Sequence, residues 1–327
     1  MSRFEIQLDL GENYHDPYDF VEAAVFAEQL GYKKAWLGDH FFPWFHSAKK
    51  SAFVWSILGV ALEKTRIIKL GPLVSTPIGA RYHPAIVAQA SATIDNMYPG
   101  RFLLGLGTGE AVNERPFLND KWPAWSERIE RLAEAISLIR DLFEKDEPFS
   151  FSGKYFHSDF YYLYTKPKTK IPMYLSAVGK NACYYAGKYG DHLVTMSPRN
   201  TSEKLRTELL PAYEKGCKDA GRNRGEVVIC LSCSLGTPDE VWASSRNTLG
   251  FMAKDSWSLK TPVEVENRGK ALTLDELRRC VHFCRTWDDL IATIQGYIDI
   301  GATGAVLYTG PDRKLMQEYA RNLLPVF

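Results

Sequence analysis

The feature that most constrains the fold of this chain is an alternation of short strand-like runs with longer helix-like runs. Eight runs rich in apolar residues read as strands, and a helix-like segment follows each of them. The eight strand-like segments lie at 4–11, 33–39, 66–74, 101–109, 172–178, 191–196, 227–236 and 304–310. Eight such units favour an α/β fold of the closed (β/α)8 type, the TIM barrel, over an open doubly wound sheet. An open sheet of the dinucleotide-binding type is expected to carry a G-x-G-x-x-G turn in its first β/α unit, and none occurs there.

The helix boundaries follow from residues that start and stop helices. One helix is expected over Pro17–Leu30, entered at Asp16 and ended by Gly31, and another over Pro84–Met97, with proline in its first position. A long amphipathic helix is expected over Trp125–Lys145.

Two stretches interrupt the alternation and are expected to be insertions in a luciferase-like barrel. The first, near 146–170, reads as an aromatic hairpin around Ser152–Gly153. The second, near 253–275, includes an irregular stretch at 254–270. No linker divides the chain, so we expect a single TIM-barrel domain over residues 1–327.

Composition narrows the class of protein. Hydrophobic residues make up 45% of the 327 residues and charged residues 24%, with a formal net charge of +1. This balance gives no reason to expect a nucleic-acid or membrane partner. The N-terminus lacks a signal peptide pattern and no run approaches the roughly 20 apolar residues of a spanning helix, so we expect a cytoplasmic protein.

Six cysteines allow two interpretations. Cys230-x-x-Cys233 and Cys280-x3-Cys284 have spacings seen in zinc sites. The first pair lies in an extended run, where an odd spacing directs its side chains to opposite faces. We therefore expect buried thiols and no metal site.

Catalytic groups of a β/α barrel lie at the carboxyl ends of its strands, which directs attention to the end of the second strand. There Asp39 and His40 precede an aromatic segment that contains Trp44. A histidine suits proton transfer near neutral pH. The alternative is a structural histidine beneath a loop, and its position at a strand end favours the catalytic interpretation.

The end of the fourth strand, at 105–114, combines a glycine-rich turn with an acid. Glycines allow the backbone to approach a flat ring or a phosphate closely. Glu110 would then lie in a partly apolar pocket, which raises the pKa of a carboxyl group and suits a general acid. The third strand ends at 72–77 in a bend bounded by prolines, which is compatible with a bulge against a ligand or with a plain loop.

At these strand ends the sequence resembles the bacterial-luciferase-like superfamily, and within it the dehydrogenases that use the deazaflavin coenzyme F420. The resemblance rests on four segments, GDHFFPWFH at 38–46, LGPLVSTP at 70–77, the stretch at 81–114 ending in GTGEAVNE, and MYLSAVGK at 173–180. It extends over essentially the whole chain.

The resemblance implies a coenzyme F420 molecule across the barrel mouth. Asp39 would contact its ring, and Leu73–Val74 would form a non-proline cis peptide in a bulge behind the ring. Further residues would hold the ring and the tail of the coenzyme: Thr76, Gly107, Thr108, Gly109 and Asn113. Backbone N–H groups of a last segment would approach the phosphate: Ser176, Ala177, Val178 and Gly179.

The resemblance also implies a mechanism. His40 would take the proton of a substrate hydroxyl while the carbon-bound hydrogen leaves as a hydride to C5 of the deazaflavin. Trp44 would position the reacting centre, and Glu110 would supply a proton toward the reduced ring. The chemistry of the coenzyme leaves positioning and proton management to the protein.

The substrate is less defined. The sugar-phosphate branch of the family uses several basic residues, and Arg279 falls at one such position. The segments 196–198 and 255–257 are not basic, although Arg199 is near. A secondary-alcohol branch has a smaller pocket, and Glu12 or Asn13 would reach the substrate from the first strand. An alcohol, a sugar phosphate or a carbonyl compound remains open.

Three further alternatives are kept: an F420-dependent methylenetetrahydromethanopterin reductase, an FMN-dependent monooxygenase, and a non-catalytic binding barrel. The resemblance also implies a homodimer.

Overall fold

The structure is a computed structural model, and it describes residues 4–11, 15–197, 201–245, 250–253 and 255–327. Its centre is a parallel sheet of eight strands in the order β3-β2-β1-β12-β9-β8-β7-β4. The strands are β1 (Glu5–Asp9), β2 (Lys34–Leu37), β3 (Lys69–Pro72), β4 (Leu104–Leu106), β7 (Met173–Ser176), β8 (His192–Ser197), β9 (Val227–Leu231) and β12 (Gly304–Tyr308). All eight coincide with segments expected from the sequence.

The two outer strands of this order, β3 and β4, meet and close the sheet into a barrel. Parallel bridges join Leu70 to Phe102 and Ser75 to Leu106. Close contact at this seam requires glycine, because a Cβ atom on Gly71 would lie 2.1 Å from the carbonyl oxygen of Leu103. The (β/α)8 barrel expected from the alternation is confirmed.

Helices surround the barrel, and several of them begin and end at the residues that the sequence indicated. The helix α1 (Pro17–Leu30) follows a capping box at Asp16 and ends at Gly31, whose φ of 96° is the left-handed conformation that glycine adopts readily. The other helices are α2 (Val54–Lys64), α3 (Pro84–Met97), α4 (Ala111–Glu114), α5 (Trp125–Glu144), α6 (Lys180–Tyr189), α7 (Ser202–Lys204), α8 (Leu210–Asp219), α9 (Pro238–Ser245), α10 (Pro262–Lys270), α11 (Leu274–Arg278), α12 (Trp287–Asp299) and α13 (Arg313–Leu323). Short 3-10 segments lie at His46–Ala48, Arg115–Leu118, Gly250–Met252 and Ser256–Ser258, and a π-helical turn lies at Leu205–Leu209.

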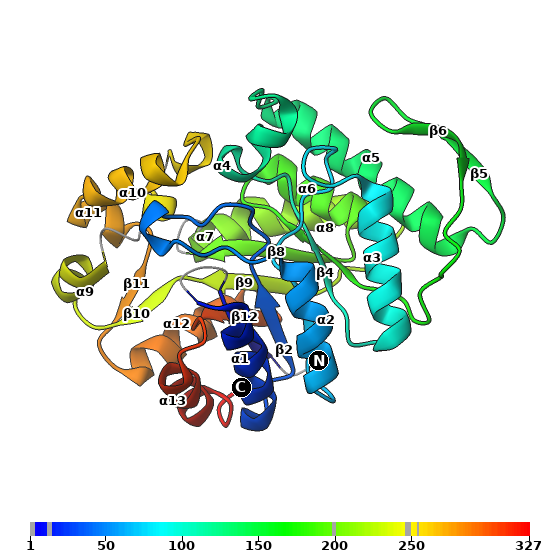
Figure 1. Ribbon diagram of the computed structural model, residues 1–327. Coiled ribbons are helices and arrows are strands. Elements are labelled where there is room, and N and C mark those ends of the chain that lie inside the picture. The colour runs from blue at the N-terminus through cyan, green and yellow to red at the C-terminus, as the bar shows by residue number, and fades with distance from the viewer. Residues whose placement is uncertain (1–3, 12–14, 198–200, 246–249, 254) are drawn as a thin grey trace.

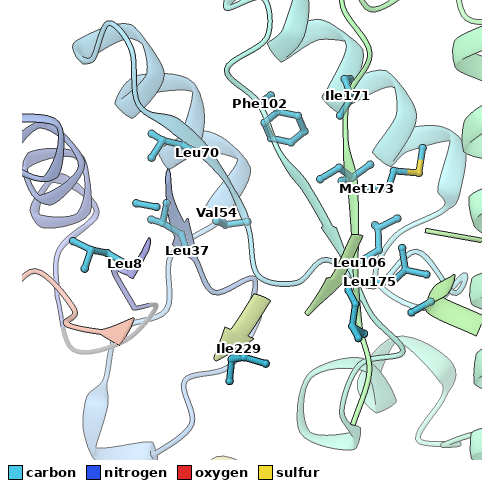
Figure 2. Packing of buried hydrophobic residues seen from close by; sticks show 14 of the residues in the cluster. Leu8, Leu37, Val54, Leu70, Phe102, Leu106, Ile171, Met173, Leu175 and Ile229 are labelled. Carbon is cyan, nitrogen blue, oxygen red and sulfur yellow. The ribbon is translucent and has the colours of Figure 1, made fainter. Parts of the chain in front are cut away.

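Two apolar layers hold the barrel together. The outward side chains of the strands pack against the helices, as Figure 2 shows for Val54 of α2 beside Leu37 and Leu70. Inside the barrel a second cluster consists of Trp36, Leu103, Tyr174, Val194, Val228 and Val306. The barrel centre is therefore a packed core, and any ligand must bind above it at one mouth.

The amino-terminal end of the barrel is closed by charged groups. Lys34 lies between Glu226 and Glu5, with N–O distances of 2.8 and 2.9 Å. The hydroxyl of Tyr174 donates to the same Glu226 carboxylate at 2.8 Å. These paired charges and the core above them leave the opposite, carboxyl-terminal mouth for chemistry.

The first expected insertion is an antiparallel hairpin of β5 (Phe149–Ser152) and β6 (His157–Tyr161), which projects from the barrel in Figure 1. Its turn is longer than a Ser-Gly dipeptide, since the N–H of Gly153 donates to the carbonyl of Phe156 at 2.9 Å.

The second expected insertion differs from the sequence analysis. Residues 262–270 form the helix α10, capped by the Thr261 hydroxyl, so the expectation of an irregular stretch is wrong there. The segment 227–236 is also not one strand. At Ser232 the chain leaves the barrel, and β10 (Cys233–Leu235) pairs in parallel with β11 (His282–Cys284) in a separate small sheet. This sheet and the helices α9 to α11 flank the barrel mouth.

The two cysteines of the Cys230–Cys233 pair lie in different parts of the fold. Cys230 packs on the barrel interior, whereas Cys233 lies on β10 near the Tyr319 hydroxyl, and neither is in a disulfide. None of the described helices combines the length and the apolar character that crossing a membrane requires.

Candidate active site

Residues expected to act together do converge at the carboxyl-terminal mouth. The amide oxygen of Asn113, beyond β4, accepts hydrogen bonds from the backbone N–H groups of Phe41 and Phe42, beyond β2, at 3.0 Å each. A Cβ atom on Gly107 would lie 2.5 Å from Val74 and 3.8 Å from Ser176. The ends of β2, β3, β4 and β7 therefore border one site.

His40 and Trp44 form the aromatic side of this site. Their rings meet edge to face, with centroids 4.8 Å apart. Trp44 is stacked in turn on Phe251, with centroids 5.4 Å apart and 29° between the planes. Burial, with a smaller contribution from the positive charge of Arg81, lowers the pKa of His40 to about 3. The imidazole is therefore uncharged at physiological pH, the form that can accept a proton, and burial makes it a weaker base than an exposed histidine.

Asp39 is the acceptor at the centre of a buried polar network. Its carboxylate accepts hydrogen bonds from Arg81 at 2.8 Å, from the Tyr82 hydroxyl at 2.9 Å, and from the Ser75 hydroxyl. Burial raises the pKa of Asp39, and the positive charge of Arg81 opposes this effect. The expected contact between Asp39 and a ring stays a prediction. The observed role of Asp39 is to fix the end of β2 to the loop that follows β3.

Two further carboxyl groups lie close to Arg81. Glu114 is buried, and its carboxylate oxygen is 3.3 Å from the Arg81 guanidinium. Burial raises the pKa of Glu114 to about 7 and that of Glu110 also to about 7, and Arg81 opposes both shifts. The positive charge of Arg128, from α5, likewise opposes the shift of Glu110. A carboxyl group with such a pKa can hold a proton at neutral pH and release it, as expected of Glu110.

A flat cofactor fits the surface between these groups. Gly107 leaves open the space beside Val74 and Ser176 that a side chain would fill, and Gly109 adopts a left-handed φ of 70° over Thr76 and Glu114. The peptide between Leu73 and Val74 is cis, as expected. The buried amide nitrogen of Asn113 has no hydrogen-bond partner among the described residues, so a donor remains for a ligand. Thr76 is buried, whereas Thr108 is partly exposed on the same turn.

The expected phosphate segment at the end of β7 needs one correction. The N–H of Ala177 donates to the carbonyl of Val194 at 2.9 Å, so the sheet uses it and a phosphate cannot. Gly179 is the N-cap residue of α6, and a Cβ atom on it would meet nothing within 4 Å. The open amino terminus of α6, beside Ser176 and Val178, is the part of this segment that can receive an anion.

The expected substrate residues are only partly placed. Glu12 and Asn13 lie outside the described residues. Arg279 is exposed at the end of α11, just before β11. Within the two segments that carry no basic residue, the Ser197 hydroxyl hydrogen-bonds His282, and Asp255 lies 3.0 Å from Arg268 of α10, so a cation does lie beside the second segment.

Several residues of the site were not singled out from the sequence. Arg81 and Tyr82 follow β3 by about ten residues, and only the surrounding motif, not their chemistry, drew attention to them. Glu114 is the last residue of the GTGEAVNE motif, but nothing in the sequence indicated its role. Asp9 ends β1, its carboxylate accepts from the N–H of Gly11 at 2.8 Å, and burial raises its pKa to about 6. A polar residue at a strand end was the available signal for Asp9.

A barrel whose carboxyl-terminal mouth carries an uncharged histidine, two acids whose pKa is raised to about 7 and a glycine-lined surface defines an enzyme of the cofactor-binding β/α barrel class. The model of the luciferase-like monooxygenase family matches residues 1–303, so the chain belongs to that family.

Relatives of known kind support this membership. An F420-dependent glucose-6-phosphate dehydrogenase of Segniliparus rotundus is 33% identical over 95% of this chain and 94% of the relative. A solved F420-dependent secondary alcohol dehydrogenase, in complex with an F420-acetone adduct, has a TM-score of 0.91 and 30% identity, with both chains covered completely. A coenzyme F420-dependent tetrahydromethanopterin reductase from Methanopyrus kandleri, at 19% identity and a TM-score of 0.79, shows likeness of fold alone.

Proposed function

We propose that this protein is a coenzyme F420-dependent oxidoreductase acting on CH–OH groups, which transfers a hydride from a hydroxyl-bearing carbon to C5 of the deazaflavin. One observation carries the proposal: two groups suited to proton transfer stand at one glycine-lined surface. They are the uncharged imidazole of His40, which is held against Trp44, and the carboxyl group of Glu110, whose pKa is about 7. The names of the relatives above agree with both the coenzyme and the reaction.

The residues present divide the binding of the coenzyme between them. Gly107, Gly109 and Val74 would face the ring, the amide of Asn113 would donate to it, and the amino terminus of α6 would receive the phosphate. When bound, the deazaflavin supplies the carbon that accepts the hydride.

The chain's own groups manage the protons. The neutral imidazole of His40 accepts the proton of the substrate hydroxyl as the C–H bond breaks. Trp44 restricts the direction in which that imidazole can point, because its ring packs against the imidazole edge. Glu110 holds a proton on its carboxyl group and releases it into the site when negative charge arrives there.

The substrate is proposed only as a class. A secondary alcohol fits the aromatic side formed by Trp44 and Phe251, whereas a sugar phosphate would need cations, of which Arg279 is one at the edge of the mouth. A carbonyl compound would be the substrate of the reverse reaction. The homodimer and the cytoplasmic location stay predictions from the family resemblance and the sequence.

Binding of two cofactors to the purified protein tests the proposal. Absorbance and fluorescence titrations with F420 and with FMN should show saturable binding of F420 and much weaker binding of FMN. Mixing the F420 complex with a panel of secondary alcohols and sugar phosphates should bleach the deazaflavin absorbance. Tight binding of FMN with no response to F420 would favour the monooxygenase alternative and overturn the proposal.

A further inference from the structure

We infer that Arg81 is a positioning residue for His40: its guanidinium binds the carbonyl oxygen of Asp39 and so fixes the peptide group that leads into His40. The placement of His40 is a property of this chain alone. Only the use of that placement to remove a substrate proton rests on the proposed function.

The backbone that carries His40 lies outside regular secondary structure. The strand β2 ends at Leu37, where it is paired with Pro72, and residues 38–45 belong to no helix or strand. The hydrogen-bond ladder of the barrel therefore stops before His40. Backbone polar groups beyond such a strand end need other partners, and side chains from distant parts of the chain can supply them.

Two hydrogen bonds of Arg81 end on Asp39. One guanidinium nitrogen donates to the Asp39 carboxylate at 2.8 Å, and the other donates to the backbone carbonyl oxygen of Asp39 at 2.7 Å. That carbonyl belongs to the peptide group that also contains the backbone nitrogen of His40. Because a peptide group is planar, a bond that fixes its oxygen also fixes the direction in which the chain enters His40.

The peptide group that follows His40 is fixed as well. The Ser51 hydroxyl donates to the carbonyl of His40 at 3.1 Å, and the amide oxygen of Asn113 accepts from the N–H of Phe41, in the same peptide group, at 3.0 Å. Side chains thus bind both peptide groups that flank the Cα atom of His40. The imidazole retains only its own side-chain rotations, and Trp44 packs against its edge.

Arg81 is itself held in one place. Its side chain is only 7% exposed, and its guanidinium lies over the ring of Tyr82, 4.6 Å from the ring centroid. Glu114 lies 3.3 Å from the guanidinium and accepts from the backbone N–H of Arg81 at 3.4 Å. Charge-assisted hydrogen bonds of this kind are strong, more so where water is scarce. A buried and oriented guanidinium is therefore a firm support for the Asp39 carbonyl.

The support requires a guanidinium and not a positive charge alone. Arginine presents its N–H groups in a planar fork, so two nitrogens of Arg81 can bind two oxygens of Asp39, whereas lysine has a single nitrogen. Arg81→Lys keeps the charge that faces Asp39 and Glu114 but removes the simultaneous bonds to the carboxylate and the carbonyl. This variant separates positioning from charge compensation.

Nuclear magnetic resonance of the protein without coenzyme tests the placement directly. The chain has seven histidines, and in protein labelled at the imidazole carbons the His40 signal is the one that His40→Asn lacks. The Trp44 ring should displace this signal in the wild type, because the two rings meet edge to face. In Arg81→Lys the signal should broaden or move toward the position of an exposed histidine, while the signal of the exposed His157 stays in place. An unchanged His40 signal overturns the inference, whatever the coenzyme is.

Arg101→Lys is the matched control. This arginine also donates to backbone carbonyls, but it lies before β4 at the amino-terminal end of the barrel, and its acceptors are Leu62, Thr65 and Ile68. Its replacement should lower the melting temperature without moving the His40 signal.

A second variant covers the case in which Arg81→Lys does not fold. Arg81→Gln combined with Glu114→Gln removes the cation together with one of the acids that it pairs, and the shorter glutamine cannot reach the Asp39 carbonyl. The His40 signal should move in this double variant as well, and a signal that stays in place would count against the inference equally.

Kinetics provide the second readout. With F420 and an alcohol that is turned over, Arg81→Lys should slow coenzyme reduction in a single turnover about 10-fold, less than the roughly 100-fold expected for loss of the base itself. F420 affinity and the KM for the alcohol should stay near the wild-type values. In the His40→Asn background the same substitution should cost less than about 2-fold, because no imidazole is left to position. Equal losses in the two backgrounds would overturn the positioning role.

The two readouts separate this inference from the proposed function. Binding of FMN but not F420, together with a His40 signal that moves in Arg81→Lys, would contradict the proposed function and leave the positioning role of Arg81 supported. Turnover of an alcohol with F420, together with an unmoved His40 signal, would support the proposed function and overturn the inference.

Discussion

The rings of His40 and Trp44 meet edge to face at the barrel mouth, with centroids 4.8 Å apart and 74° between their planes. The same burial that brings the rings together lowers the pKa of His40 to about 3. One environment therefore keeps the imidazole uncharged and fixes its orientation, and it also weakens the imidazole as a base, because proton transfer is most efficient when the pKa lies near the working pH.

Replacement of His40 by asparagine should remove the base and preserve the fold of the site. We expect F420 affinity to remain near the wild-type value while alcohol oxidation falls about 100-fold, the scale of general base catalysis. Steady-state kinetics and a fluorescence titration measure the two quantities. His157→Asn, on the exposed hairpin strand β6, is the matched control and should change neither. Full activity in His40→Asn would exclude this residue as the base.

A side chain at Gly107 should obstruct the cofactor surface. In Gly107→Ala the new Cβ atom would lie 2.5 Å from Val74, so the segment behind the proposed ring position must shift. Overpacking of this kind costs about 1–3 kcal/mol, and we expect a weaker F420 complex, about 10-fold or more in Kd, and a lower melting temperature. Gly296→Ala in α12, where a Cβ atom meets nothing within 4 Å, should retain wild-type affinity. Unchanged affinity in Gly107→Ala would place the ring elsewhere.

The sequence predicted the barrel because each unit carries its own local signals. Asp16 and Gly31 bound α1, Pro84 begins α3, and these positions depend on nearest neighbours alone. The insertion at 254–270 was misread because its weak periodicity and many charges outweighed a local helix-start signal, Thr261 followed by Pro262 and Glu264.

For the site, the sequence located residues but not their partnerships. His40 and Glu110 were singled out because both stand at strand ends. The contacts of Arg81 were not predicted, because its partners Asp39 and Glu114 lie 42 and 33 residues away along the chain. Contacts of that separation arise from barrel closure and leave no local pattern.

The raised pKa values of the buried acids predict how stability depends on pH. A carboxyl group whose pKa is about 7 when folded and 4.5 when exposed binds more protons in the folded state between these values. The free energy of unfolding should therefore fall as pH rises through that window. In Glu114→Gln one such group is gone, so the fall should be shallower. Denaturant unfolding at several pH values between about 5 and 8 measures this, and equal slopes in the two proteins would contradict it.

Phe251 should control the substrate side of the site through Trp44. Its ring is stacked on the Trp44 indole and lies 6.1 Å from the Phe45 ring, and it comes from the insertion between β10 and β11. In Phe251→Ala the indole loses this stacked support, so its orientation is less restricted. We expect the KM for a small alcohol to rise about 10-fold, equivalent to about 1.4 kcal/mol, with F420 affinity unchanged.

Phe251→Leu, which keeps apolar volume but not the stacked plane, separates support from simple bulk. If a stacked ring is what orients Trp44, leucine should recover only part of the alanine effect, whereas full recovery would show that volume alone is needed. Tryptophan fluorescence measured without substrate should report the change in the Trp44 environment in both variants. An alanine variant whose KM rises while F420 affinity falls equally would place Phe251 on the coenzyme side of the mouth.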